Sequence, residues 1–156
     1  MIWKLKEFGF KTEELLTLWK VVLRPIAEYA APLWHPSLIE GDVRKLENLQ
    51  KTAIGLILGT IYIDHRRYYR VYGKPVSYQE ALKHCELSTL AERRDTLTCK
   101  FALETYRCGL HKDFFEVEDV DRPNTRFKPK VKEHTGNTSR FRNSALPTMS
   151  KHVNKN

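Results

Sequence analysis

The stretch EELLTLWKVVLRPIAEYAAPLWHP, residues 13–36, determines how the rest of the chain is organised. Its apolar residues recur at steps of three and four, the spacing that places side chains on one face of a helix. Pro25 interrupts the pattern, because proline lacks an N–H group and its ring crowds the preceding turn. The sequence therefore predicts a kink, or two helices that meet near Arg24. The largest anchors available to a core are Trp19, Tyr29 and Trp34.

Positive charge is concentrated at the end of the chain. The protein has 156 residues and a formal net charge of +8. Residues 1–121 contain equal numbers of basic and acidic residues, whereas residues 122–156 contain nine basic residues and one acidic residue, Glu133. A basic tail that is poor in apolar residues indicates a polyanionic partner, and nucleic acid is the commonest candidate. A solvated end without specific contacts is the alternative.

Capping signals predict where further helices begin. Glutamate follows three residues after Ser37, Ser77 and Thr89, the capping-box pattern that satisfies N–H groups at a helix start. Asp42 is an alternative start for the first of these helices, because Gly41 weakens its first turn. The helices expected from these signals cover residues 38–58, 78–85 and 90–108.

Taken as a whole, the sequence predicts an all-α fold. A short helix at residues 2–8 completes a small helical bundle of about five helices in residues 1–109. After Gly109 the helical pattern fails, and residues 122–131 are basic and interrupted by proline. We therefore expect residues 110–156 to form a basic, mostly irregular and largely extended C-terminal extension.

One segment combines aromatic and basic residues. Residues 61–75, IYIDHRRYYRVYGKP, interleave tyrosines with three arginines. Arginine beside tyrosine can contact phosphates and stack on bases, although an ordinary surface loop or short ribbon has the same composition. Together with the basic residues of the tail, these arginines form the candidate nucleic-acid-binding set: Arg66, Arg67, Arg70, Lys128, Lys130, Lys132, Arg140 and Arg142.

Patterns for catalysis or metal binding are weak. The acidic cluster in residues 116–121 lies in a predicted loop, without the rigid support that a two-metal site requires. Cys108 and His111 have a spacing typical of zinc ligands, but no convincing second pair accompanies them. The chain also lacks a nucleophile elbow and a phosphate-binding glycine loop. We therefore expect no catalytic residue, no metal site and no cofactor.

The cysteines and the apolar runs bear on location. Three cysteines without framework spacing fit a reducing compartment. The first residues lack the apolar region of a secretory signal, and no run approaches the roughly 18 apolar residues that cross a bilayer. We expect an intracellular protein, in the nucleus or the cytoplasm, with no membrane partner.

Four sequence blocks follow one another along the chain. They are R-P-x-x-E-Y-A-x-P-x-W at residues 24–34, L-E-x-x-Q-K-x-A at residues 46–53, L-x-x-R-R at residues 90–94, and R-x-R-N-S at residues 140–144, followed by Pro147. In this order, and with these separations, they resemble the C-terminal part of non-LTR (LINE-type, jockey-like) retrotransposon reverse transcriptases, downstream of the polymerase palm. The resemblance covers nearly the whole chain.

This resemblance implies a thumb and post-thumb segment, in which a helical bundle grips the backbone of the template–primer duplex. No residue of the chain matches the catalytic Asp-Asp motif of the family or its endonuclease, so the expected product is a non-catalytic fragment of an RNA-directed DNA polymerase. RNA, DNA or an RNA–DNA hybrid would be the partner, and the face of residues 15–33 would contact palm and fingers. Ala145 and Thr148 depart from the bulkier residues of the family pattern.

Two other interpretations remain open. The chain could be a small helical adaptor retained by a host, with the face of residues 15–33 bound to another protein; such a function requires an exposed apolar patch. It could also be a retroelement relic that folds without a function.

Overall fold

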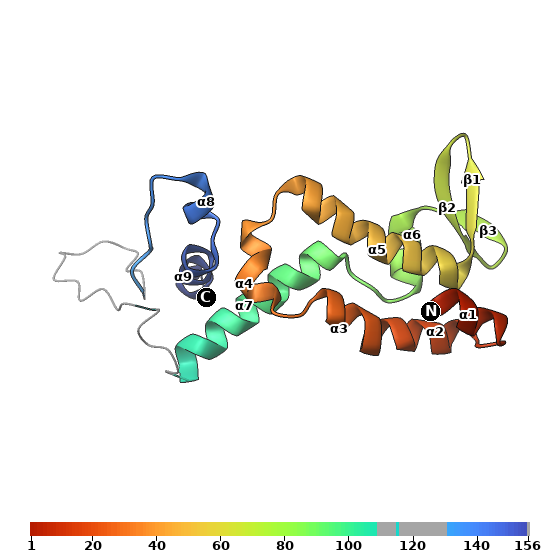
Figure 1. Cartoon of the computed structure of the whole chain (residues 1–156), viewed down its shortest axis with the longest axis horizontal. Helices are drawn as coiled ribbons and strands as arrows, with labels where there is room; N and C mark the ends of the chain where they lie inside the picture. Colours follow the sequence, from red (N-terminus) through yellow and green to blue (C-terminus); the bar gives the residue numbers. More distant parts are fainter. Residues whose placement is uncertain (109–114, 116–130, 156) are drawn as a thin grey trace. The chain divides into compact units, whose positions relative to one another are not determined.

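The computed structural model describes residues 1–108, 115 and 131–155 (Figure 1). The described part is mostly helical and contains one small antiparallel sheet. The chain forms two compact units: unit 1 comprises residues 1–29 and 39–93, and unit 2 comprises residues 30–38 and 94–156. The boundary predicted at residue 109 stays a prediction, because Gly109 lies outside the described residues.

Unit 1 contains the N-terminal helices, the sheet and the helix that follows it. Its elements are α1 (Ile2–Glu7), α2 (Thr12–Leu18), the π-helical turn η1 (Trp19–Leu23), α3 (Arg24–Ala27), α5 (Glu40–Leu58), β1 (Thr60–Ile63), β2 (Arg66–Val71), β3 (Lys74–Val76), α6 (Tyr78–His84) and the first residues of α7 (Leu90–Cys108).

The predicted junction near Arg24 is present, and it is a wide helical turn. The π-helical turn η1 connects α2 to α3, and the backbone keeps helical dihedral angles at Trp19 and at Arg24. Pro25 occupies the first turn of α3. Because the π turn widens the spiral just before the proline ring, the missing N–H and the bulk of the ring are tolerated there. Ala30, with φ of 52°, then ends the helical run.

Long helix α5 begins later than its sequence signal indicates. Ser37 lies in a short 3-10 turn and forms no capping box with Glu40, which is already the first residue of the helix. The predicted C-terminal stop at Gly59 is confirmed, with φ of 92°. Gly55 permits a close approach of helix and sheet: a Cβ added there would lie 2.6 Å from Thr60 Oγ1.

The prediction of an all-α fold is wrong for residues 60–76. These residues form a three-stranded antiparallel sheet in the order β1-β2-β3. Each hairpin has a two-residue turn in which both residues have positive φ, Asp64-His65 and Tyr72-Gly73. Such turns match the twist of paired strands, and aromatic and β-branched residues favour the extended backbone between them. The helix signals on both sides of this segment concealed its preference for strands.

The core of unit 1 joins α1, α2, η1, α5, the sheet and α6. Tyr69 is the residue through which the sheet enters this core, and its side chain is 1% exposed. In Figure 1, α5 runs alongside α2, and both α1 and α2 contact it. The buried residues of this core are Ile2, Leu15, Trp19, Ala53, Ile54, Ile57, Tyr69, Ala81, Leu82, Cys85 and Leu87.

Unit 2 shows that the predicted irregular extension is partly helical. Besides α4 (Ala31–Trp34), η2 (His35–Ser37) and most of α7, it contains α8 (Ser139–Arg142) and α9 (Ala145–Lys155). Met149 and Val153 lie one turn apart on α9 and are buried together with Ala102, Phe115 and Val131. This amphipathic spacing stabilises a helix that the basic composition of the tail concealed. The predicted extended segment 122–130 lies outside the described residues.

The side-chain amide of Asn154 holds Val131 in place. Asn154 Oδ1 accepts a hydrogen bond from the Val131 N–H at 3.0 Å, and Asn154 Nδ2 donates to the Val131 carbonyl at 3.0 Å. Both backbone groups of a fully buried residue are thereby satisfied. None of the helices in the described ranges combines the length and apolar composition needed to span a membrane.

Helix α6 ends in a motif that favours glycine, yet it contains glutamate. Glu86 has φ of 52°, its N–H donates to the Lys83 carbonyl, and the Leu87 N–H donates to the Leu82 carbonyl. This pair of bonds is the Schellman motif, whose left-handed residue is usually glycine because a Cβ costs about 1 kcal/mol or more there.

We expect Glu86→Gly to raise the free energy of unfolding by about 0.5–1 kcal/mol, measured by urea denaturation, because it removes the steric cost of the left-handed backbone. The control is Lys83→Gly at an exposed helical position, which should lower it by about 1 kcal/mol. A destabilised Glu86→Gly variant would contradict the assignment.

Candidate nucleic-acid interface

The predicted binding residues fall into separate groups. Arg66, Arg67 and Arg70 all lie on β2 in unit 1 and are exposed. Lys132, Arg140 and Arg142 are exposed residues of unit 2, the last two on α8. Lys128 and Lys130 lie outside the described residues. The structure thus brings the three arginines together on one strand and leaves the tail residues as a second group.

The pleat of β2 divides its three arginines between two faces. Side chains alternate along a strand, so Arg67 shares a face with the buried Tyr69. Arg66 and Arg70 share the opposite face with Tyr68, which is half-buried between them in the sequence register. β2 is the central strand, so both of its edges are hydrogen-bonded to neighbouring strands. The sequence grouped the arginines correctly but did not separate them.

The outer face of the sheet carries an aromatic ring flanked by cations. Tyr68 is paired with Ile61 on β1, and Arg70 is paired with Pro75 on β3. A tyrosine between two arginines provides a surface on which a base can stack while guanidinium groups reach neighbouring phosphates. We call Arg66, Tyr68 and Arg70 the outer triad.

The inner face of the sheet borders a polar pocket. The pocket has a volume of about 430 Å³ and lies between α5, β2 and α6. The Nζ atom of Lys51 lies 5.2 Å from the centroid of the Tyr78 ring, and the guanidinium carbon of Arg67 lies 5.9 Å from that of Tyr62. The residues that line the pocket are Asn48, Lys51, Thr52, Arg67, Tyr69 and Tyr78.

The titratable groups around this pocket present positive or neutral forms. A hydrogen bond with Tyr62 is the main cause that raises the pKa of Arg67, so its guanidinium stays charged. Burial raises the pKa of Tyr69, and burial followed by a hydrogen bond with Glu47 raises that of Tyr78. Both phenols are therefore neutral in the physiological range.

A buried polar network fixes the wall of the pocket. Tyr78 Oη donates to Glu47 Oε1 at 2.5 Å, and the other oxygen of Glu47 accepts the Leu90 N–H at 3.0 Å. Gln50 Nε2 donates to the Ser88 carbonyl at 2.9 Å and to Tyr78 Oη at 3.3 Å. Glu47 and Gln50, two residues of the L-E-x-x-Q-K-x-A block, thus connect α5 to α6 and to the start of α7.

Another pair of blocks is connected by an ion pair. Arg93 Nε donates to the carboxylate of Glu28 at 2.8 Å, and the Glu28 side chain is 4% exposed. Burial, followed by the charge of Arg93, lowers the pKa of Arg24. From the sequence, solvated ion pairs with the neighbouring Glu92 and Asp95 are expected for Arg93; the structure pairs it with the nearly buried Glu28 instead.

Arg94 in unit 2 is also buried, with 0% exposure. Its Nε donates to Nδ1 of His35 at 3.4 Å, and its guanidinium carbon lies 5.8 Å from the centroid of the Trp34 ring. Burial, followed by the charge of Arg94, lowers the pKa of His35. The neutral imidazole can therefore accept a hydrogen bond from the arginine N–H.

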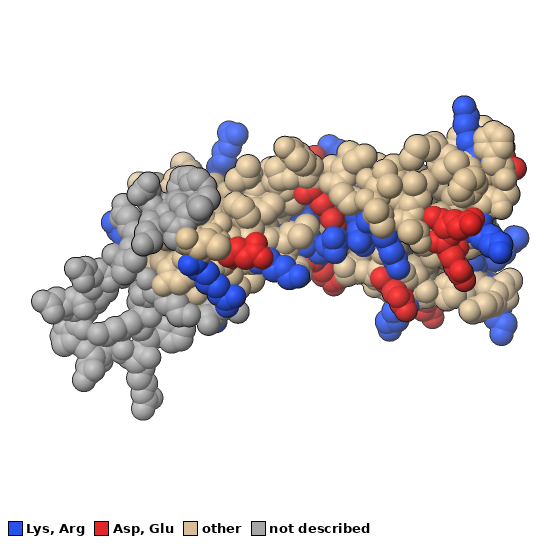
Figure 2. Space-filling view, turned by 90° about the horizontal axis from the view of Figure 1, so that it is seen from below, with Lys and Arg blue, Asp and Glu red and all other residues tan. Residues whose placement is uncertain are grey.

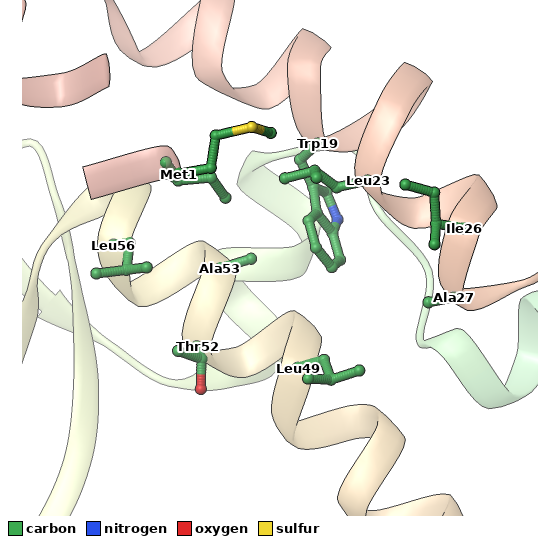
Figure 3. A pocket seen from close by; sticks show the side chains of 10 residues that line it. Met1, Trp19, Leu23, Ile26, Ala27, Leu49, Thr52, Ala53 and Leu56 are labelled. Atoms are coloured by element: carbon green, nitrogen blue, oxygen red, sulfur yellow. The ribbon is translucent and has the colours of Figure 1, made fainter. Parts of the chain in front are cut away.

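An apolar groove is the second hollow of unit 1 (Figure 3). It has a volume of about 520 Å³, and Trp19, Leu23 and Ile26 border it opposite Leu49 and Leu56 of α5. Trp19 is 5% exposed, and its buried indole N–H has no hydrogen-bond partner among the residues that the structure describes. The remaining lining residues are Met1, Ile2, Ala27, Thr52 and Ala53.

Charge on the surface is mixed rather than uniform. Figure 2 shows Lys and Arg interspersed with Asp and Glu on the face in view. On α5, Arg44 pairs with Glu40 at 3.8 Å and Lys45 pairs with Asp42 at 2.9 Å. Within the described part of the chain, Arg66, Arg67, Arg70 and Lys51 take part in no ion pair, so their charges are available to an anion.

The residues considered for catalysis or metal binding lie only partly in the described part of the chain. The acidic cluster of residues 116–121 and His111 lie outside them. Among the residues that the structure describes, no group of three or more His, Cys, Asp or Glu side chains is placed to hold a metal ion. Cys85 is buried, which raises the pKa of its thiol, and Cys108 is exposed.

Comparison with known proteins adds no relative: no family model, curated protein or solved structure matches the chain.

The environment of His35 predicts a pH-dependent stability. Since its pKa is lower in the folded chain than the usual value near 6.5, the unfolded chain binds the proton first as the pH falls. We expect the free energy of unfolding to be highest above about pH 6.5 and to decrease below it, toward the folded pKa. Urea denaturation between about pH 8 and pH 5 measures this dependence.

Two variants identify the group responsible. His35→Gln should flatten the profile over this range, since glutamine keeps an acceptor but does not titrate. His84→Gln, at an exposed position of α6, is the matched control for the loss of one histidine. An unaltered slope in the His35→Gln variant would show that another group titrates.

Proposed function

We propose that this protein binds nucleic acid through its phosphate backbone and performs no catalysis, as a thumb-like segment of a non-LTR retrotransposon reverse transcriptase. The observation that carries the proposal is the outer triad, two exposed arginines on either side of a tyrosine on the central strand of a sheet. Phosphate contacts require cations on a rigid support and no reading of base edges.

The packing of the sheet supports this use of the triad. Tyr69 anchors β2 in the core of unit 1, and β2 contacts both α5 and α6. Cations on an anchored strand lose less conformational freedom on binding than cations on a mobile loop, so more of the contact energy is retained as affinity. The exposed Arg140 and Arg142 on α8 supply further positive charge in unit 2.

The four ordered sequence blocks support the assignment to a thumb-like segment. Three of them supply residues that contact one another within the fold: Glu28 with Arg93, Trp34 with Arg94, and Glu47 with the N–H of Leu90. A set of residues whose contacts depend on one another fits inheritance from one folded ancestor better than chance similarity of four short patterns.

A protein-binding adaptor is the second candidate, and the apolar groove favours it. Ile26 and Leu49 are 70% and 52% exposed on its two sides. A partner helix with an apolar face would bury both side chains. Under this alternative, the basic residues of β2 would not affect binding of the partner.

We expect the full chain to bind a labelled RNA–DNA hybrid, and Arg66→Gln with Arg70→Gln to lower the magnitude of the salt slope of binding by about 1–2, because each phosphate contact releases about one counterion. The affinity at low salt should fall about tenfold or more. Fluorescence anisotropy across a salt series measures both, and hybrids of equal length but different sequence should bind alike.

The matched control is Arg44→Gln with Lys45→Gln. It removes the same charge from unit 1, but from residues already paired with acidic neighbours on α5. The tail is tested by Arg140→Gln with Arg142→Gln rather than by truncation, because removing residues 122–156 would also remove α9 from the core of unit 2. Equal losses in the β2 variant and the control would contradict specific use of the outer triad. Absence of any binding at low salt would favour the adaptor or the relic.

A further inference from the structure

We propose that the polar pocket between α5, β2 and α6 binds a single phosphate group of the nucleic-acid backbone, held jointly by Lys51 and Arg67. This inference rests on the proposed function and adds a second contact site, on the face of the sheet opposite the outer triad.

The composition of the pocket indicates an anionic ligand. Two cations line it from different elements, Lys51 from α5 and Arg67 from β2, and no acidic side chain is among its lining residues. The two oxygens of Glu47, the carboxylate nearest to these residues in the sequence of α5, accept hydrogen bonds from Tyr78 of α6 and from the Leu90 N–H of α7. No carboxylate among the lining residues offsets the two cations.

Neutral donors complete a site for several acceptor oxygens. Asn48 and Thr52 lie one helical turn apart on α5 and both line the pocket. Their amide and hydroxyl groups can donate to oxygens that the cations leave unsatisfied. A phosphate offers such oxygens in a tetrahedral arrangement, and a guanidinium can contact two of them at once.

The size of the pocket fits a phosphate that is part of a chain. A volume of about 430 Å³ exceeds what one phosphate group occupies, and this leaves room for the attached sugar. The rings of Tyr69 and Tyr78, whose centroids are 5.8 Å apart, form an aromatic part of the wall. Tyr78 is held in place by Glu47 and Gln50, so the wall is rigid.

Shared use of one phosphate makes a specific prediction for variants. We expect Lys51→Gln and Arg67→Gln each to lower the magnitude of the salt slope of hybrid binding by about 1, and the double variant to lower it by little more than either alone. Two residues that bound separate phosphates would give additive losses instead. Lys51→Arg, which keeps the charge, should retain most of the affinity.

A control variant and a small-molecule probe distinguish binding in the pocket from binding at the outer triad. Lys45→Gln removes one charge from the same helix and should change the affinity less than twofold. In a titration of the isotope-labelled full chain with adenosine 5′-monophosphate, NMR signals of Asn48 and Thr52 should shift, and adenosine without phosphate should leave them unchanged.

The outcomes distinguish the two proposals. Loss of binding in the outer-triad variant without loss in Lys51→Gln or Arg67→Gln would overturn the pocket inference and retain the proposed function. Additive losses in the double variant would overturn the sharing of one phosphate. Failure of the full chain to bind any hybrid at low salt would overturn both.

Discussion

The arrangement of unit 1 depends on the hydrogen bonds that the carboxylate of Glu47 accepts. This carboxylate accepts hydrogen bonds from the Tyr78 hydroxyl of α6 and from the first N–H of α7, while the Gln50 side chain one turn later donates to the Ser88 carbonyl between those helices. One turn of α5 therefore fixes the positions of the first residue of α6 and the first residue of α7. A half-buried carboxylate that lost either donor would keep an unsatisfied charge, and this makes the contacts mutually dependent.

The same turn of α5 separates structural from functional residues. Glu47 and Gln50 face the network, whereas Asn48 and Lys51 face the polar pocket. Because successive helical residues are rotated by about 100°, neighbours in the sequence serve different surfaces. The block L-E-x-x-Q-K-x-A therefore combines residues that stabilise the fold, Glu47 and Gln50, with a cation, Lys51, whose position they help to fix. The sequence pattern alone cannot divide these roles, since both kinds of residue are polar.

Local signals predicted the features that depend on local chemistry. The capping boxes at Ser77 and Thr89 are formed, with both reciprocal hydrogen bonds, whereas the same pattern at Ser37 and Glu40 forms none. Features that need a distant partner were not predictable. The partner of the buried Arg94 lies 59 residues away, so its sequence neighbours do not reveal the contact. Lys51 was absent from the candidate site because Arg67, which lines the same pocket, belongs to another element. The alternation of β2 was available from the sequence once a strand was assumed, but the arginines masked the strand.

The distribution of charge indicates which part of unit 1 would meet a phosphate backbone. Unit 1 contains 14 basic and 11 acidic residues, an excess of only three positive charges, so attraction to a polyanion must come mainly from places where cations lack acidic neighbours. On α5, Arg44 and Lys45 are paired within one turn, and Arg93 is paired with a nearly buried carboxylate. Arg66, Arg70, Arg67 and Lys51 lie instead on or beside a sheet whose strands contain no acidic residue. Position relative to carboxylates, more than the number of basic residues, therefore selects this sheet as the site where unit 1 would meet a phosphate backbone.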